Sequence, residues 1–436
     1  MRTALAQITG DDFITEVPAE FASLDGVRPR YLVKPGNPQE IAAVLEAAGR
    51  EQWAVLPIGS GSAIAIGNPP RRGDIWLSTA RLNAFEEYES ADLTATVQSG
   101  CLLFDLNRVF GEHGQILPLD PPGAGSRTIG GIVATAQTGT LRLGYGQPRD
   151  WILGLQIATP DGKLIRSGGK VVKNVAGYDL TRLFTGSYGT LGIITQVSLK
   201  VYPKPATEMT MVCGSDEIVR VWKTVEHMLS GNINPVSLEI VSENALRRVG
   251  LEGELPGYCL CVRVAGEEAD VRVQTMQMER IASESELSVR APVPAETAGA
   301  FWQMVSDLPL GFPIVVRLNT VPSRLPRFLS MAADTLRQAA ECVYFSASAG
   351  IGCATLMVEG PSDATLMNKL LPALSEIRRQ VVSSGGSVIL QKLPPGWKEH
   401  IDVWGPTGTA ASLMKGMKQA FDPSGVLNPG RFVEGI

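Results

Sequence analysis

The chain lacks several features that would place it in large classes of protein. Its net charge is -5, and no Lys/Arg block is interleaved with aromatic residues, so no surface for nucleic acid is expected. No stretch approaches the roughly 20 apolar residues of a membrane span. Asp11 and Asp12 stand where a signal peptide would need its apolar run. We therefore expect a cytoplasmic protein without a transmembrane segment.

Histidine and cysteine are also sparse. The chain has three histidines, His113, His227 and His400, and no two of them have metal-ligand spacing. The six cysteines are scattered singly except for Cys259 and Cys261, whose spacing puts both side chains on one face of an apolar strand. Reduced structural thiols are expected, and no metal site is predicted.

Glycine, in contrast, is abundant, with 46 residues, and many of its clusters fall between residues 117 and 203. These clusters lie at Gly123/Gly125, Gly130/Gly131, Gly144/Gly146, Gly168/Gly169 and Gly186/Gly189/Gly192. Glycine lets backbone amides come close to a phosphate or a flat ring. This segment is therefore expected to be built around one ligand.

A second glycine-rich stretch, residues 58–62, reads Ile-Gly-Ser-Gly-Ser and follows an apolar strand. Backbone amides in such a loop can bind a pyrophosphate. The loop is not a Rossmann fingerprint, because Ile64 stands where the third glycine belongs, and no Gly-Lys-Ser/Thr follows as in a Walker loop. Alone it could equally be an ordinary turn, but beside segment 117–203 we expect it to bind phosphate.

Periodicity predicts an α+β fold. Residues 37–50 form an amphipathic helix capped by Asn37, and residues 193–201 alternate as a strand that Pro203 ends. Between 207 and 391 the order strand, helix, strand, strand, helix, strand occurs twice, which is the ferredoxin-like unit. A last helix is predicted over 407–421. Its expected buried stripe is Leu413, Met414, Met417 and Phe421.

Four motifs, at Thr128–Thr135, Arg149–Gly162, Val172–Thr195 and Phe421–Phe432, occur in the order found in PCMH-type, or vanillyl-alcohol-oxidase, FAD-binding flavoproteins. The chain most resembles the branch that contains glycolate oxidase and D-lactate dehydrogenase subunits. The resemblance implies a two-part PCMH-type FAD-binding domain and a ferredoxin-like cap, duplicated as above. The implied divisions are an N-terminal extension (1–27), the FAD-binding domain (28–205), the cap (206–391) and a C-terminal segment returning to the FAD domain (392–436).

The resemblance and the glycine pattern together give the expected FAD-binding residues. They are Ile58, Gly59, Ser60, Gly61, Ser62, Pro118, Thr128, Gly130, Gly131, Thr135, Gly139, Arg142, Tyr145, Gly146, Lys173, Gly189, Gly192, Ile193 and Asn428. The loop has no His or Cys, and the nearest ones, Cys101 and His113, are placed in a predicted helix, so a noncovalent FAD is expected. Lys173, Arg142 and Arg182 are candidates for a positive group beside reduced flavin. A solvated surface charge is the favoured alternative for Arg182 and an equal one for Lys173.

The resemblance is incomplete at the substrate site. Metal-using relatives carry a HAGDGNLH stretch, and the corresponding residues 348–355 here read SAGIGCAT, with both histidines, the aspartate and the asparagine replaced. Arg317 is a candidate carboxylate-binding cation. Tyr178 is a candidate base, with Tyr145 and Tyr188 as alternatives.

This loss makes the chain resemble the smaller, accessory FAD-binding subunits of the glycolate oxidase family. Such a subunit works with a larger related flavoprotein and an iron–sulfur subunit in oxidising glycolate to glyoxylate, and passes electrons to a partner. The chain is then expected in the cytoplasm, with a peripheral contact to the inner membrane through its partners. The alternatives are an independent FAD-dependent dehydrogenase of another alcohol or hydroxy acid, and a non-catalytic FAD-stabilised assembly subunit.

Overall fold

The computed structural model describes residues 1–17, 24–169, 178–254 and 256–436. Lys173, predicted from sequence to face the cofactor, lies outside the described residues. No helix within these ranges is long and apolar enough to cross a membrane.

The N-terminal part of the chain forms a four-stranded sheet in the order β1-β2-β4-β3, in which β2, β4 and β3 are parallel and β1 is antiparallel to β2. Its strands are β1 (Ile14–Glu16), β2 (Tyr31–Val33), β3 (Val55–Ile58) and β4 (Ile75–Ser78), and its helices are α1 (Arg2–Thr9) and α2 (Pro38–Glu51). α2 begins as expected, because the Asn37 side chain accepts a hydrogen bond from the Glu40 amide. Its buried face packs into one core with α1, the sheet and part of the C-terminal tail.

A second sheet follows, with five antiparallel strands in the order β5-β6-β10-β8-β9. Its strands are β5 (Phe85–Glu89), β6 (Thr94–Gln98), β8 (Ile152–Ala158), β9 (Leu164–Gly168) and β10 (Ile193–Lys200). The short helices beside it are α3 (Leu103–Gly111), α4 (Ile129–Thr135), α5 (Arg142–Tyr145), α6 (Pro148–Trp151) and α7 (Leu180–Phe184). β7 (Gln115–Ile116) pairs with β11 (Tyr202–Pro203) where the chain leaves this half of the molecule.

The remaining large sheet has eight strands in the order β15-β12-β14-β13-β17-β18-β16-β19. The strands are β12 (Thr207–Ser215), β13 (Ser237–Ser242), β14 (Tyr258–Gly266), β15 (Ser288–Val289), β16 (Ile314–Asn319), β17 (Cys342–Ser348), β18 (Cys353–Glu359) and β19 (Ser387–Lys392). The helices are α8 (Ile218–Ser230), α9 (Glu243–Arg248), α10 (Glu268–Glu284), α11 (Ala295–Asp307), α12 (Leu325–Arg337) and α13 (Ala364–Ser383). The two predicted ferredoxin-like units are joined edge to edge by β13 and β17, which confirms the α+β fold class.

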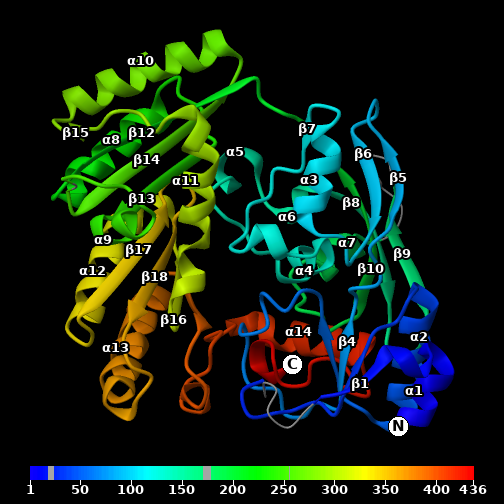
Figure 1. Cartoon of the computed structure of the whole chain (residues 1–436). Coiled ribbons are helices and arrows are strands. Elements are labelled where there is room, and N and C mark those ends of the chain that lie inside the picture. The colour runs from blue at the N-terminus through cyan, green and yellow to red at the C-terminus, as the bar shows by residue number, and fades with distance from the viewer. Residues whose placement is uncertain (18–23, 170–177, 255) are drawn as a thin grey trace.

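The large sheet has two different faces. One packs a continuous apolar core under α8, α10, α12 and α13, with Leu238, Ile240 and Phe345 fully buried. The other carries a smaller apolar cluster under α9 and α11. We call the part of the molecule that contains the first two sheets and the C-terminal tail the cofactor half. α11 stands between the large sheet and this half (Figure 1). This second face therefore borders the place where the two halves meet.

The tail returns to the first sheet (Figure 1). Leu427 forms a parallel bridge with Val55 of β3, so the tail extends that sheet by one short pairing. The last helix, α14, spans Ala411–Phe421, but its predicted buried stripe is wrong. Leu413 is 69% exposed and Met414 36%, because the helix lies on the surface. Phe421 is partly buried, and its ring packs on that of Phe184.

Candidate functional site

A large pocket opens where the first sheet, the second sheet and the tail converge. It encloses about 930 Å³ of empty space, including the part open to solvent. We call it the glycine pocket. The predicted cofactor residues that line it are Ile58, Gly59, Ser60, Gly61, Ser62, Thr128, Gly130, Gly131, Thr135, Gly189, Gly192, Ile193 and Asn428.

The loop after β3 supplies one wall of the glycine pocket. The four amides of Gly59–Ser62 donate no hydrogen bond to any described residue, so they are available to an anion in the pocket. The backbone also comes very close to the facing helix: a Cβ at Gly59 would lie 2.2 Å from Thr128 Oγ1. The same Thr128 hydroxyl caps α4 by accepting from the Gly131 amide. Glycine at position 59 is therefore required by space.

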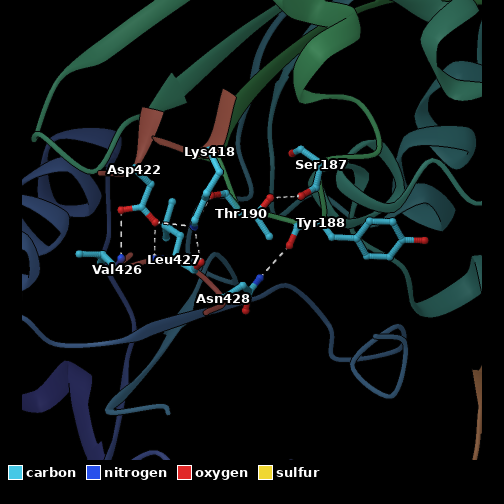
Figure 2. Close-up of polar contacts among 8 residues, drawn as sticks. All are labelled: Ser187, Tyr188, Thr190, Lys418, Asp422, Val426, Leu427 and Asn428. Atoms are coloured by element: carbon cyan, nitrogen blue, oxygen red, sulfur yellow. Dashed lines mark hydrogen bonds and ion pairs between the residues drawn. The ribbon is translucent and has the colours of Figure 1, made fainter. Parts of the chain in front are cut away.

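The opposite wall is held by the tail through a buried ion pair (Figure 2). Lys418 Nζ lies 2.6 Å from Asp422 Oδ2 and also donates to the carbonyls of Thr190 and Leu427, both at 2.8 Å. The Asp422 carboxylate accepts from the amides of Val426 and Leu427. These bonds fix the loop after residue 187 against the tail, and so they hold the Gly189 wall in place.

Asn428 completes this attachment. Its side-chain nitrogen donates to the Tyr188 carbonyl at 2.7 Å (Figure 2). Tyr188 has a φ of 53°, an unfavourable conformation for an aromatic residue, and its ring packs against Trp404 and Phe432, which also contact each other. The tail thus holds a strained residue at the pocket wall. The motif containing Asn428 signals this role in sequence, whereas the Tyr188 conformation has no sequence signal.

Two buried arginines in the glycine pocket were missed by sequence reasoning. Arg127 is 3% exposed, and the only hydrogen bond that its guanidinium donates to a described residue runs from Nε to the Pro122 carbonyl. Arg431 donates to the carbonyls of Ile64 and Ile66 and so holds the end of the β3 loop. Burial lowers the pKa of each guanidinium to about 10, so both remain charged at neutral pH.

The glycine pocket fits an extended cofactor with a phosphate. The hydroxyl of Ser99 lines it, is fully buried, and has no hydrogen-bond partner among the described residues. With the free amides and Arg127, it offers a bound group several hydrogen-bond donors. No His or Cys is among the described residues lining this pocket. Cys101 lines an adjoining groove and precedes α3, and His113 follows α3. Neither residue lies in the helix, so their predicted placement in a helix is wrong.

A second pocket lies between the two halves of the molecule. We call it the arginine pocket, because Arg142 from the cofactor half and Arg317 from β16 both line it. Gly139, predicted to bind the cofactor, lines it too, and a Cβ there would lie 1.9 Å from the Asp120 carbonyl. Within the described chain, neither guanidinium group makes a hydrogen bond or an ion pair. Each guanidinium is therefore available to an anionic ligand.

Glu239 of β13 is the acid of the arginine pocket. It is 3% exposed and accepts hydrogen bonds from Ser346 and Ser348 of β17. Burial raises the pKa of its carboxyl to about 7. Sequence reasoning missed it because it sits in a strand whose six residues are all buried. A single charged residue in such a strand is the signal that could have found it.

The two halves are joined beside this pocket by Asp120. Its carboxylate accepts from the Thr140 hydroxyl at 2.8 Å and from the Ser306 hydroxyl of α11 at 3.0 Å. The amides of Thr140 and Leu141 donate to the same group. Burial raises the pKa of Asp120, while these hydrogen bonds oppose the shift. The network fixes the loop that carries Arg142.

Several predicted residues line neither pocket. Pro118 is buried, Gly146 ends α5, and Tyr145 packs its ring on Tyr202. Tyr178, the candidate base, is 94% exposed and lies next to residues that are not described. Arg182 is exposed and forms an ion pair with Asp179, which fits the alternative of a solvated surface charge.

The hairpin that replaces HAGDGNLH reaches the arginine pocket. Its residues Ser348, Ile351, Cys353 and Thr355 line the pocket. Across the described residues, no three His, Cys, Asp or Glu side chains gather as metal ligands would. The hairpin therefore contributes small polar and apolar surface to this pocket.

Comparison with known proteins finds two domains whose models match parts of the chain. Residues 29–168 match the model of the FAD binding domain, and residues 404–432 match the C-terminal domain of FAD linked oxidases. The chain therefore carries an FAD binding domain and the C-terminal domain of FAD linked oxidases. It is an oxidoreductase that binds FAD, as the sequence predicted. The matched segments carry the β3 loop, α4 and the Asn428 tail that surround the glycine pocket.

Several similar proteins are hydroxy-acid oxidoreductases. The chain is 29% identical to glycolate oxidase subunit GlcD of Bacillus subtilis, over 92% of this chain and 88% of that protein. It is 27% identical to D-2-hydroxyglutarate dehydrogenase of Xanthomonas citri pv. viticola, over 93% and 89%. A solved structure of p-cresol methylhydroxylase has a TM-score of 0.78 at 15% identity, covering 98% of this chain and 95% of that one. This last likeness shows the PCMH-type fold.

Proposed function

We propose that the chain is the FAD-binding subunit of a glycolate oxidase complex. In the complex, glycolate is oxidised to glyoxylate, and the electrons pass to a related larger flavoprotein and an iron–sulfur subunit. The relative named glycolate oxidase subunit GlcD supports the substrate class and the presence of a complex. The single observation that carries the proposal is the arginine pocket, with two unpaired guanidinium groups at the junction of the halves.

The roles of the chain's own residues follow from the two pockets. The amides of Gly59–Ser62 bind the pyrophosphate, and the Asn428 tail holds the opposite wall of the glycine pocket. Bound FAD supplies the two-electron acceptor. Arg317 and Arg142 bind and orient the substrate carboxylate. The divisions predicted from sequence, 28–205 for the FAD domain and 206–391 for the cap, remain part of this proposal, as does a cytoplasmic protein reaching the inner membrane through its partners.

An independent dehydrogenase of another small hydroxy acid is the second candidate. The buried acid Glu239 favours it, because a carboxyl in the pocket can serve as the base that takes the hydroxyl proton. The tyrosines considered from sequence do not fill this role well. Tyr178 is exposed, Tyr145 is packed on Tyr202, and burial raises the pKa of Tyr188 to about 12.

Turnover measurements separate the candidates. The isolated chain, loaded with FAD, is expected to oxidise glycolate and D-lactate negligibly with an artificial acceptor, and to be insensitive to chelators. Adding the related flavoprotein and the iron–sulfur subunit is expected to give activity that requires this chain. Robust turnover by the chain alone, at the rate of the complex, would replace the subunit proposal with the independent dehydrogenase. A complex that stays active when the glycine pocket is destroyed would leave a non-catalytic assembly subunit.

A further inference from the structure

A row of polar side chains crosses the face of the large sheet that borders the cofactor half. Register pairs Glu239 of β13 with Ser348 of β17, and Ser348 with Cys353 of β18. It also pairs Thr355 of β18 with Arg317 of β16. The neighbouring residues in each strand point to the opposite face and form the large apolar core. Four adjacent strands therefore direct polar groups into one pocket, although the strands lie far apart in the sequence.

These polar groups do not neutralise one another. No ion pair joins Glu239 to Arg317 or Arg142 within the described chain. The side-chain oxygen of Gln137, which also lines the pocket, is buried and has no hydrogen-bond partner there. Buried charges and orphan polar atoms cost stability, so such a set is expected where a ligand completes it. The pocket offers cationic donors, one acceptor and one acid.

We propose that Glu239 is a ligand-contacting, proton-exchanging residue of the arginine pocket, and that a small carboxylate binds between it, Arg142 and Arg317 with uptake of one proton. The carboxylate class rests on the proposed function. The Gln137 oxygen accepts from a hydroxyl group of a hydroxy acid. The proton moves from solvent to the Glu239 carboxylate when the ligand enters, which removes the repulsion between two carboxylates.

The direction of the pH dependence follows from the surroundings of Glu239. The titratable and charged groups that face it are Asp120 from the loop before α4, Arg142 from α5, Cys261 from β14, Arg317 from β16 and Cys353 from β18. Burial raises the pKa of Glu239 to about 7, although the two serine hydroxyls and Arg317 oppose the shift. Below that pH, the acid is neutral and can donate a hydrogen bond. Above it, the charged carboxylate repels an anionic ligand.

The test is calorimetric titration of the FAD-loaded chain with oxalate, a small dicarboxylate that has no C–H bond to oxidise, between pH 5.5 and 8.5. The dissociation constant is expected to rise toward about tenfold per pH unit above pH 7, the limit for one linked proton. At pH 8.5, paired buffers of different ionisation enthalpy should report uptake approaching one proton. Glu239→Gln is expected to bind with little pH dependence. Arg317→Gln should weaken binding at least about tenfold, whereas the exposed control Arg337→Gln should not change it.

Ser348→Ala gives a second readout if Glu239→Gln folds poorly. It removes a hydrogen bond that favours the charged carboxylate, so the midpoint of the pH dependence should move upward. Unchanged pH dependence in Glu239→Gln would overturn the proposal by assigning the proton to Asp120 or Cys353. Absence of oxalate binding, or equal binding of inorganic phosphate, would overturn it too. If oxalate binds as described but no complex oxidises glycolate, the proposed function alone fails.

Discussion

The two pockets of this protein are built in different ways. The glycine pocket is made largely of backbone: loop amides, close helix–loop contact at Gly59 and a tail fixed by hydrogen bonds. The arginine pocket is made of side chains, which come from separate strands and from both halves of the molecule. A backbone site tolerates little change in shape, whereas a side-chain site can change its chemistry while the sheet stays the same. Cofactor binding can therefore persist where the residues for substrate chemistry have been replaced.

The strongest expected effect on FAD binding is at Gly59. A Cβ in Gly59→Ala would lie 2.2 Å from the Thr128 hydroxyl, so either the loop or the α4 cap must move. FAD affinity is expected to fall at least about tenfold, which corresponds to about 1.4 kcal/mol. Gly61→Val and Gly131→Val are expected to act in the same direction. Flavin content and FAD titration of the apoprotein measure the effect.

The control for this prediction is Gly125→Ala, in the same glycine-rich segment. A Cβ there meets nothing within 4 Å, so flavin content should be unchanged. Circular dichroism should report native folding in both variants. Normal FAD affinity in Gly59→Ala would show that the cofactor does not depend on the close approach of this loop to α4.

The next effect concerns the ion pair that holds the tail. In Lys418→Met, the Asp422 carboxylate, with no exposed side-chain surface, would lose its cation. Breaking a buried pair by removing one partner costs about 3–5 kcal/mol. Denaturant unfolding of the apoprotein measures this loss. Lys415→Met, three residues earlier in α14, removes an exposed cation and should leave stability unchanged. Equal stability of the two variants would refute a supporting role for the buried pair.

The contrast between the backbone-built glycine pocket and the side-chain-built arginine pocket also explains which features the sequence could predict. The β3 loop and the Asn428 tail depend on local chain geometry, and their motifs indicate it. Arg142 was assigned to the cofactor, but its position follows from how the two halves pack, which no local pattern encodes. The pairing of the β13 and β17 edges and the position of Glu239 in the pocket also depend on tertiary packing, which no local pattern encodes. For α14, helical periodicity predicted a buried face, but the helix lies on the surface and has no buried residue.

Charged Glu239 in the arginine pocket should lower the stability of the fold, whereas the buried Lys418–Asp422 ion pair should raise it. Because folding raises the pKa of Glu239 from 4.5 to about 7, the folded state binds its proton more tightly than the unfolded state. This contribution to stability is present at low pH and is lost as pH rises through 7. Glu239→Gln should therefore stabilise the protein at pH 8, by at most about 3 kcal/mol, with little change at pH 5.

Chemical unfolding at the two pH values checks this sign. Glu279→Gln is the control, because Glu279 is an exposed acid of α10. Glu279→Gln should leave stability nearly unchanged at both pH values. Destabilisation by Glu239→Gln at pH 8 would mean that the charged acid is held by favourable contacts, and the contrast between the two pockets would then weaken.

The smallest expected effect is at Cys101, and it tests whether the backbone pocket suffices to hold FAD. Cys101 is the cysteine nearest the β3 loop: it lines the adjoining groove together with Gly59 and Ser60. Burial raises the pKa of its thiol to about 11, so the nucleophilic thiolate is scarce at neutral pH. The thiol also donates weakly to the Ala84 carbonyl. Cys101→Ser should thus keep its flavin content, and acid precipitation of either form should release all the yellow colour as FAD. Flavin retained in the wild-type pellet but released from Cys101→Ser would instead identify a covalent link at this residue, and the amides of the glycine pocket would then not account for FAD retention.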